Sequence, residues 1–377
     1  MSAEMAEAIH QLVQDKGMSP ESIRNTITEA LKAAYKRKFG TTDNAVVKFA
    51  DDMSDVSIYS RKVIMDGVYD PATEIELEDA LQMSPDCEVG DEIDILLDPT
   101  TDFDRSAVQT GKQIAKQSMS EIQKDTLYAE YKDKLNEIII GYYQRERNGT
   151  IFVDLGKVEG VLPVKNQSSR EVYHKGDRIK ALAIDLKKTV SGLQVILTRA
   201  SPEFVRSIIE VEVPELSDKT VEIYKIVREA GYRTKIAVLS TREDVDPVGA
   251  CVGLKGVRIQ TVIRELEGEK IDILKFDSNP TVFIKNALTP AEVKEVIILD
   301  EDKRQALVIV GESQFSLAIG KQGLNVRLAN KLSDWNIDVK CDTQTEEISD
   351  LVSESRKAAS ELFSTAEPTA GRGAPVS

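Results

Sequence analysis

A short pattern of glycine and lysine residues occurs twice near the end of this chain. Residues 250–259 read ACVGLKGVRI, and residues 317–326 read LAIGKQGLNV. In each copy a small apolar run leads into Gly-x-x-Gly with a Lys inside, and a stretch with helical spacing follows. Two tandem copies predict an extended track that grips a strand of nucleic acid by its backbone, rather than a catalytic pocket.

The chemistry of this pattern is that of phosphate binding. Glycine lets another backbone approach closely and adopts unusual dihedral angles at little steric cost. The second glycine opens a helix, whose first N–H groups have no intrahelical partner and therefore attract phosphate. Lys255 and Lys321 add a positive charge at this point. The arrangement is typical of a KH module, whose GXXG loop clamps the backbone of a few nucleotides.

The predicted RNA-binding residues lie in the two loops and on the polar face of the helices that follow. They are Gly253, Leu254, Lys255, Gly256, Arg258, Gly320, Lys321, Gln322, Gly323, Asn325, Arg327 and Lys331. A lone Gly-x-x-Gly is more often an ordinary turn or helix cap, so a purely structural duplication is the alternative. A phosphate-loop NTPase is excluded, because Gln322 follows Gly320-Lys321 where Ser or Thr is needed and the earlier glycine is absent.

The composition restricts the kind of partner. The chain has 377 residues and a net charge of −15, which argues against indiscriminate coating of DNA because phosphate binding needs Lys and Arg. Residues 303–340 are locally basic, with six Lys or Arg against three Asp or Glu. The three cysteines are scattered and match no zinc pattern, which suits a reducing cytosol. No signal peptide or membrane span is evident.

No catalytic set emerges from the sequence. The two histidines, His10 and His174, fall in different predicted domains, and no Ser/His/Asp or Cys/His arrangement has local support. We therefore expect no enzyme activity, no metal site and no cofactor.

Residues 1–130 predict an α+β head. Helices are expected over 5–16, from an N-cap at Ser19 to about residue 39, and from 104 to about 136. Alternating apolar runs between 45 and 97 predict a small sheet.

Residues 137–200 predict a small closed β-barrel of the OB type. Five strand-like runs separated by turn residues lie at 138–143, 150–155, 160–163, 179–185 and 194–198. Tyr173 and His174, on a turn, are the expected exposed pair for base stacking. Tyr142, Tyr143 and Phe152 also offer rings for base stacking. The alternative is that Phe152 belongs to the core, and either Tyr142 or Tyr143 must point inward if they are successive strand residues.

The remainder divides into a helical connector, two modules and a tail. The connector spans 201–216, and the two KH modules span 217–277 and 278–342. The short tail, 343–377, predicts a marginal helix at 346–363 followed by a disordered end rich in Pro, Gly, Ala and Thr. The predicted fold class is thus α+β multidomain.

Several sequence blocks resemble the NusA family of bacterial transcription termination/antitermination factors. They are DPVGACVG at 246–253, GYRTKIAV at 231–238, NALTPA at 286–291, LAIGKQG at 317–323 and VDLG at 153–156. The resemblance spans about residues 4 to 342. It implies that the barrel is an S1 domain and that the tandem modules are KH domains of the type II, prokaryotic form.

The resemblance also implies a function. The head would dock on core RNA polymerase near the flap and the RNA exit channel, and the S1 and KH domains would form a rigid surface for nascent single-stranded RNA. The protein would lengthen hairpin pauses, promote intrinsic termination and join antitermination complexes with other Nus factors. We expect a cytoplasmic monomer without membrane contact. Arg37, Lys38, Lys112 and Lys116 are candidate charges of the head near the RNA channel.

Two departures from the family pattern stand out. Leu324 replaces the usual Gln just after the second loop, and Ala230 replaces the usual Pro. The acidic repeat domains of some members do not follow residue 342, so autoinhibition by such a tail is not expected.

Two other functions remain open. One is a phosphorolytic exoribonuclease with KH and S1 modules, although such enzymes place KH before S1 and carry a large catalytic core. The other is a ribosome-associated RNA-binding protein, which gives no reason for the α+β head.

Overall fold

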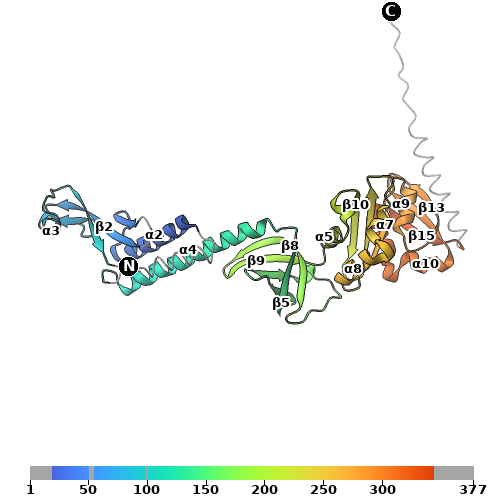
Figure 1. Ribbon diagram of the computed structural model, residues 1–377, viewed down its shortest axis with the longest axis horizontal. Coiled ribbons are helices and arrows are strands. Elements are labelled where there is room, and N and C mark those ends of the chain that lie inside the picture. The colour runs from blue at the N-terminus through green and yellow to red at the C-terminus, as the bar shows by residue number, and fades with distance from the viewer. Residues whose placement is uncertain (1–18, 51–54, 99–100, 344–377) are drawn as a thin grey trace, which may run out of the picture. The chain divides into compact units, whose positions relative to one another are not determined.

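The computed structural model describes residues 19–50, 55–98 and 101–343 (Figure 1). They fall into two compact units. One is the described part of 1–133 with 186–194, and the other is 134–185 with the described part of 195–377. The helices predicted over 5–16 and 346–363, and the predicted disordered end, lie outside the described residues.

Two long helices form the body of the head, α2 (Pro20–Phe39) and α4 (Arg105–Lys132). The side chain of Ser19 caps α2 by accepting a hydrogen bond from the Ser22 N–H, which confirms the predicted start. The helices approach closely at Gly111, where a Cβ atom would lie only 2.9 Å from the Ala30 carbonyl oxygen. A larger residue at 111 would therefore push α2 and α4 apart.

A four-stranded sheet covers these helices. Its elements are β1 (Ala45–Phe49), β2 (Val56–Met65), β3 (Glu74–Glu76), a short helix α3 (Leu77–Met83) and β4 (Glu92–Leu97). β2 is central and pairs with the other three strands. The small predicted sheet is confirmed, whereas α3 was not predicted. The buried Tyr35 hydroxyl and the Ser60 hydroxyl are hydrogen-bonded at 2.7 Å, which ties α2 to this sheet.

The predicted barrel is confirmed. Its strands are β5 (Ile138–Arg147), β6 (Thr150–Asp154), β7 (Glu159–Leu162), β8 (Arg178–Thr189) and β9 (Gly192–Thr198). They close in the order β5-β6-β7-β9-β8, so that no strand edge is left open.

The first KH module follows the barrel directly. Its elements are α5 (Pro202–Glu212), α6 (Pro214–Ser217), β10 (Val221–Glu229), β11 (Arg233–Ser240), α7 (Pro247–Val252), α8 (Val257–Glu265) and β12 (Lys270–Lys275). β11 is the central strand, antiparallel to β10 and parallel to β12. The predicted helical connector is α5 with α6, and Phe204 and Ile209 of α5 are buried in the core of this module.

The second KH module repeats this order. Its elements are α9 (Pro280–Ala287), β13 (Val293–Asp300), β14 (Gln305–Val310), α10 (Glu312–Ile319), α11 (Leu324–Ser333) and β15 (Asn336–Cys341). β14 is again antiparallel to the preceding strand and parallel to the last. The sequence repeat is therefore a repeat of structure.

The two KH modules share one hydrophobic core. Val227, Ala237 and Leu274 of the first module belong to the same buried cluster as Ile284 and Leu328 of the second. At the edges of this core, the Lys225 ammonium lies 2.7 Å from the Asp334 carboxylate, and the buried Lys235 donates to the Thr289 carbonyl oxygen at 2.6 Å. The two modules are thus joined by packing as well as by the chain.

Candidate nucleic-acid interface

The two Gly-x-x-Gly loops have the same backbone conformation. The loop segments are η2 (Leu254–Gly256), between α7 and α8, and η3 (Lys321–Gly323), between α10 and α11. Gly253 has φ 77° and ψ 170°, and Gly320 has φ 74° and ψ 171°. The repeated sequence therefore encodes a repeated turn, which is what a backbone clamp requires.

The third position of each loop is left-handed although it is not glycine. Lys255 has φ 53° and Gln322 has φ 54°. Such values are uncommon for residues with a Cβ atom. The same unusual conformation at the same place in both loops indicates that the loop shape is imposed by its surroundings.

The first glycine of each loop is required by close packing. A Cβ atom on Gly253 would lie 2.7 Å from Cγ of Arg258, and one on Gly320 would lie 2.9 Å from the backbone nitrogen of Asn325. The second glycine has space around it, but Gly256 and Gly323 have φ of 76° and 71°, which L-residues seldom adopt.

The helix starts behind the loops are open to an anion. Neither α8 nor α11 has a side-chain N-cap, so no side chain occupies their first N–H groups. Lys255 and Lys321 are exposed beside these starts, at the third loop position in one module and the second in the other. Leu254, which takes the second position in the first module, is 86% exposed. The two loops thus present their charge differently.

The structure corrects the prediction that the Asn325 side chain contacts RNA. Asn325 is fully buried, and its amide donates hydrogen bonds to the carbonyl oxygens of Leu288 at 3.0 Å, Leu317 at 3.3 Å and Ala318 at 3.0 Å. It therefore supports the loop from behind. A polar residue on a helix start was read from sequence as a surface residue, and the burial had no local signal.

Arg258 is also engaged inside the protein. Its guanidinium lies 2.9 Å from the Glu215 carboxylate and donates to the Ala250 carbonyl oxygen at 2.6 Å. Its side chain is about a third exposed, at 32%. An RNA contact by Arg258 stays a prediction. Arg258 would make such a contact in addition to its contacts with Glu215 and Ala250.

The two predicted RNA-binding cations on α11 face solvent. Arg327 and Lys331 are exposed on α11. The Arg327 guanidinium lies 3.6 Å from the Glu229 carboxylate of β10, a distance at which an exposed ion pair contributes little. Both side chains are accessible to an RNA strand, and their contact with RNA stays a prediction.

Leu324, the departure just after the second loop, is half-buried. It packs against the core shared by the two modules. An apolar side chain is therefore accommodated at this position by contacts within the protein.

On the barrel, only one of the two predicted stacking residues is exposed. The His174 side chain is 80% exposed, with Nδ1 3.5 Å from the Asp177 carboxylate. Tyr173 was expected to be exposed, and this was wrong. It is half-buried, its hydroxyl donates to Glu171, and burial raises the pKa of its phenol. Stacking of Tyr173 on RNA stays a prediction, and only the exposed part of its ring is available for it.

Of the two successive tyrosines of β5, Tyr142 is exposed and Tyr143 is half-buried, as the expected alternation requires. Tyr142 is 58% exposed, and the half-buried Phe152 ring lies 4.2 Å from the Arg145 guanidinium. A register shift in β5 occurs only after this pair, between Tyr143 and Arg145, where Arg145 comes to lie opposite Phe152. These side chains supply a ring and a cation on one strand pair, a combination suited to base stacking.

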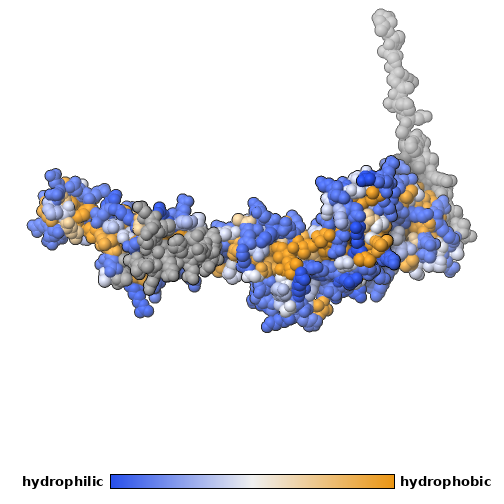
Figure 2. Space-filling view, in the orientation of Figure 1, coloured by the Kyte–Doolittle hydropathy of each residue, from blue (hydrophilic) through white to orange (hydrophobic). Residues whose placement is uncertain are grey.

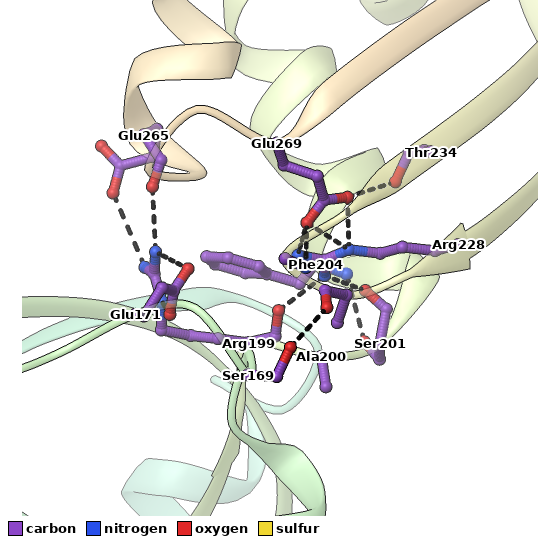
Figure 3. A network of polar contacts seen from close by, with 12 residues as sticks. Ser169, Glu171, Arg199, Ala200, Ser201, Phe204, Arg228, Thr234, Glu265 and Glu269 are labelled. Carbon is purple, nitrogen blue, oxygen red and sulfur yellow. Dashed lines mark hydrogen bonds and ion pairs between the residues drawn. The ribbon is translucent and has the colours of Figure 1, made fainter. Parts of the chain in front are cut away.

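A buried polar network joins the barrel to the first KH module (Figure 3). Arg199, at the end of the barrel, lies 2.6 Å from the Glu171 carboxylate and donates to the Glu265 carbonyl oxygen at 2.9 Å. Arg228 of β10 reaches back and donates to the Arg199 carbonyl oxygen at 2.5 Å. The barrel and the module are therefore linked in both directions by guanidinium groups.

Glu269 is the centre of the second half of this network. Its carboxylate lies 2.8 Å from the Arg228 guanidinium and accepts from the Gly231 N–H at 2.8 Å and the Thr234 hydroxyl at 2.5 Å. The side chains of Arg228 and Glu269 are both fully buried. Such a pair is stable only when its remaining polar atoms are also satisfied, as they are here.

Other chemistry has little support in the described residues. There, no group of three or more His, Cys, Asp or Glu is placed to hold a metal ion. Cys251 is buried and packs as a small hydrophobe, and this burial raises the pKa of its thiol to about 11. No helix in the described part of the chain is long and apolar enough to cross a membrane.

Comparison with known families gives matches over nearly all of this architecture. The NusA N-terminal domain matches residues 4–125, and the S1 RNA binding domain matches 132–197. The NusA-like first KH domain matches 199–276, and the NusA-like second KH domain matches 280–347. The order of the matches is that of the barrel and the two repeated modules.

Individual proteins match over almost the whole chain. The transcription termination/antitermination protein NusA of Bacillus subtilis is 43% identical over 348 residues, which cover 92% of this chain and 93% of that protein. The NusA of Borreliella burgdorferi is 47% identical and covers 90% and 70%, and that of Thermus thermophilus is 38% identical and covers 96% and 95%. The chain therefore belongs to the NusA family of transcription termination/antitermination proteins.

Proposed function

We propose that this protein is a non-catalytic elongation factor that binds RNA polymerase and nascent RNA, and thereby modulates pausing, intrinsic termination and antitermination. The observation that carries the proposal is the pair of Gly-x-x-Gly loops with one backbone conformation and uncapped helix starts behind them. Each loop offers N–H groups and a nearby Lys to phosphate, which suits single-stranded RNA of many sequences.

The barrel and the two modules extend this surface. The buried network around Glu269 and the core shared by the KH modules support a continuous RNA track, because they hold three domains together through packed side chains. A strand bound at several points on such a track gains affinity from each contact without new ordering of the protein.

The head supplies the tether in this proposal. Binding to polymerase gives the RNA-binding domains a high effective concentration of transcript, so that a modest intrinsic affinity is enough. The exposed cations Lys112 and Lys116 lie one turn apart on α4, and Arg37 and Lys38 are exposed near the end of α2. These four residues are our candidates for contacts near the RNA exit channel.

The effect on transcription follows from differential binding. A protein that prefers unpaired RNA shifts the balance between hairpin and open strand by the difference of its affinities for the two. We further propose that the protein acts as a monomer in the cytoplasm, where bacterial transcription takes place, and that it joins complexes with other Nus factors.

RNA titration tests the clamp. We expect the double variant Leu254→Asp with Lys255→Asp, and likewise Lys321→Asp with Gln322→Asp, to weaken binding of single-stranded RNA. The matched control is Val89→Asp with Lys132→Asp, which changes an exposed apolar residue and an exposed Lys of the head by the same net charge. Equal affinity for all three variants, with normal melting curves, would reject the clamp.

Four further measurements separate the alternatives. The full chain is tested for capture of core RNA polymerase and for lengthening of a hairpin pause during transcription in vitro. Phosphate-dependent degradation of RNA by the pure protein would support the exoribonuclease alternative. Co-purification with ribosomes rather than polymerase would support the third function considered above.

A further inference from the structure

The sheet end of the head carries a groove of about 470 Å³ that the proposed function does not use. It lies beside α3 and β3 and includes Ile75, Ile95 and Met83 among its apolar lining. Met83 is 59% exposed, whereas Ile75 is buried. Its volume is in the range of pockets that take up a small ligand or a few side chains.

The segment of the chain that forms most of this part of the head is acidic. Residues 63–104 contain fourteen Asp or Glu and no Lys or Arg. Figure 2 shows apolar and hydrophilic surface side by side at the α3 end of the head. A long run of one sign of charge beside an apolar groove creates a field that selects the charge of whatever binds there.

Two carboxylates at the groove have no counter-ion within the described residues. Glu76 and Asp79 line it and are exposed, with no ion pair to another described side chain. Asp94, by contrast, is paired with Arg61 and Lys48 at 2.9 Å each. The Lys62 ammonium, which also lines the groove, donates to the Pro71 carbonyl oxygen at 2.6 Å and is held at one side.

This combination excludes several classes of ligand. A nucleic acid would bring phosphates against unpaired carboxylates, which repel it. A resident metal ion is not favoured either, because the described residues contain no cluster of three ligands. What remains is a partner with positive charge at its flanks and apolar side chains between them.

We propose that this groove docks a short protein segment in which apolar anchor residues are flanked by Lys or Arg. The apolar anchors would fill the space beside Met83, Ile75 and Ile95, and the flanking cations would meet Glu76 and Asp79. The apolar contact supplies affinity, and the charges supply orientation and a faster encounter. This inference deepens the proposed role of the head, and it rests on that proposal only for the assignment of the segment to the transcription machinery.

The groove is tested with the full chain and three labelled synthetic peptides, by fluorescence anisotropy. The first peptide is Lys-Lys-Leu-Ala-Ala-Leu-Lys-Lys. The second replaces every Lys by Glu, and the third replaces both Leu by Ser. We expect the first peptide to bind and the other two to bind at least about tenfold more weakly.

Variants locate the binding. Glu76→Lys with Asp79→Lys, and separately Met83→Ser, should each weaken binding of the first peptide about tenfold. The matched control is Asp86→Lys with Glu88→Lys, which makes the same charge change on exposed acids of the same segment outside the groove lining. All of these positions are exposed. Because Glu76 and Asp79 lie at the start of α3, where a Lys opposes the helix dipole, a melting curve of each variant checks the fold.

Some outcomes would overturn the inference. Equal loss of binding in the groove pair and the control pair would mean attraction by overall charge alone. If the Ser peptide bound as well as the first peptide, apolar anchoring would be contradicted. If the first peptide did not bind at all, the docking site itself would be contradicted.

Capture of core polymerase by the full chain is measured in parallel. Failure of that capture with intact peptide binding would count against the proposed polymerase role and would leave the chemistry of the groove supported. Failure of peptide binding with intact capture would count against the groove alone.

Discussion

Arg258 and Asn325 occupy the same position in the two KH modules, two residues after the second glycine of the loop. Both donate a hydrogen bond to the carbonyl oxygen three residues before the first glycine, Arg258 to Ala250 at 2.6 Å and Asn325 to Leu317 at 3.3 Å. Each also lies against that first glycine. One position in the repeat thus holds the loop closed in both modules, with a different side chain in each.

This relationship predicts the effect of an isosteric change at Asn325. Replacing Asn325 by Asp removes the donor that serves three carbonyl oxygens and places a buried acceptor against them. We expect the free energy of unfolding to fall by about 2 kcal/mol or more, since a buried polar group loses its partners. Fluorescence of Trp335, the chain's one tryptophan, which packs on the shared KH core, will follow unfolding in urea.

The control for Asn325→Asp is Lys321→Ala, which removes an exposed side chain from the same module. It should weaken RNA binding and leave the unfolding curve unchanged. An Asn325→Asp protein as stable as the unmodified chain would contradict the assigned supporting role.

The two glycines of the second loop predict unequal costs of substitution. Gly323→Ala faces only a left-handed φ in open space, which should cost about 1 kcal/mol. Gly320→Ala faces a similar φ and also brings a Cβ atom to 2.9 Å from the Asn325 nitrogen, so it should cost clearly more. Urea unfolding of both variants tests the ranking. The opposite order would show that the loop relaxes freely around Gly320.

The buried network between the barrel and the first KH module predicts that replacing one carboxylate by an amide strongly lowers stability. Glu269→Gln leaves the buried Arg228 guanidinium without its carboxylate, which should cost about 3 kcal/mol or more. The double variant Arg228→Met with Glu269→Leu removes both charges and should be less destabilised than Glu269→Gln. Thermal unfolding of the three proteins measures the difference.

The same network should affect the affinity for RNA. We expect Glu269→Gln to weaken binding of an RNA long enough to span barrel and KH modules more than binding of an RNA short enough for one loop. Equal weakening for both lengths would mean that the network contributes to folding only.

The lowered pKa of Asp94 predicts that the head loses stability in acid. Hydrogen bonds from Arg61 and then from Lys48 lower the pKa of this carboxyl from 3.8 to about 2. The stabilisation is present above the ordinary pKa and is lost as the pH falls toward about 2, because only the unfolded chain keeps binding a proton in that interval. Circular dichroism melts between these values should show it, and Asp94→Asn should flatten the dependence. An unchanged slope in Asp94→Asn would assign the acid sensitivity to other carboxyls.

Much of this fold follows from local sequence patterns. The Ser19-Pro20 start of α2, the five barrel strands and both Gly-x-x-Gly turns depend on residues that act over a few positions, and all were predicted. The short helix α3 was not, because it has only seven residues and no side-chain cap.

The site was harder to predict than the fold because side-chain burial depends on distant neighbours. Asn325 is buried by the Leu288 segment of its own module, and Tyr173 is held by Glu171 near Arg199. Leu288 and Arg199 are distant in sequence, and although Glu171 is only two residues from Tyr173, no local pattern indicates its hydrogen bond.

The core shared by the two KH modules has a consequence for the transcript. Since Leu274 and Leu328 belong to one buried cluster, the spacing of the two loops is set by packed side chains and not by the length of a linker. A flexible linker would let the modules adjust to any separation of two bound segments, with a gradual change of affinity. Here the number of nucleotides between those segments either matches the fixed span or does not, so the protein should select RNA by the spacing of the two segments that contact the loops.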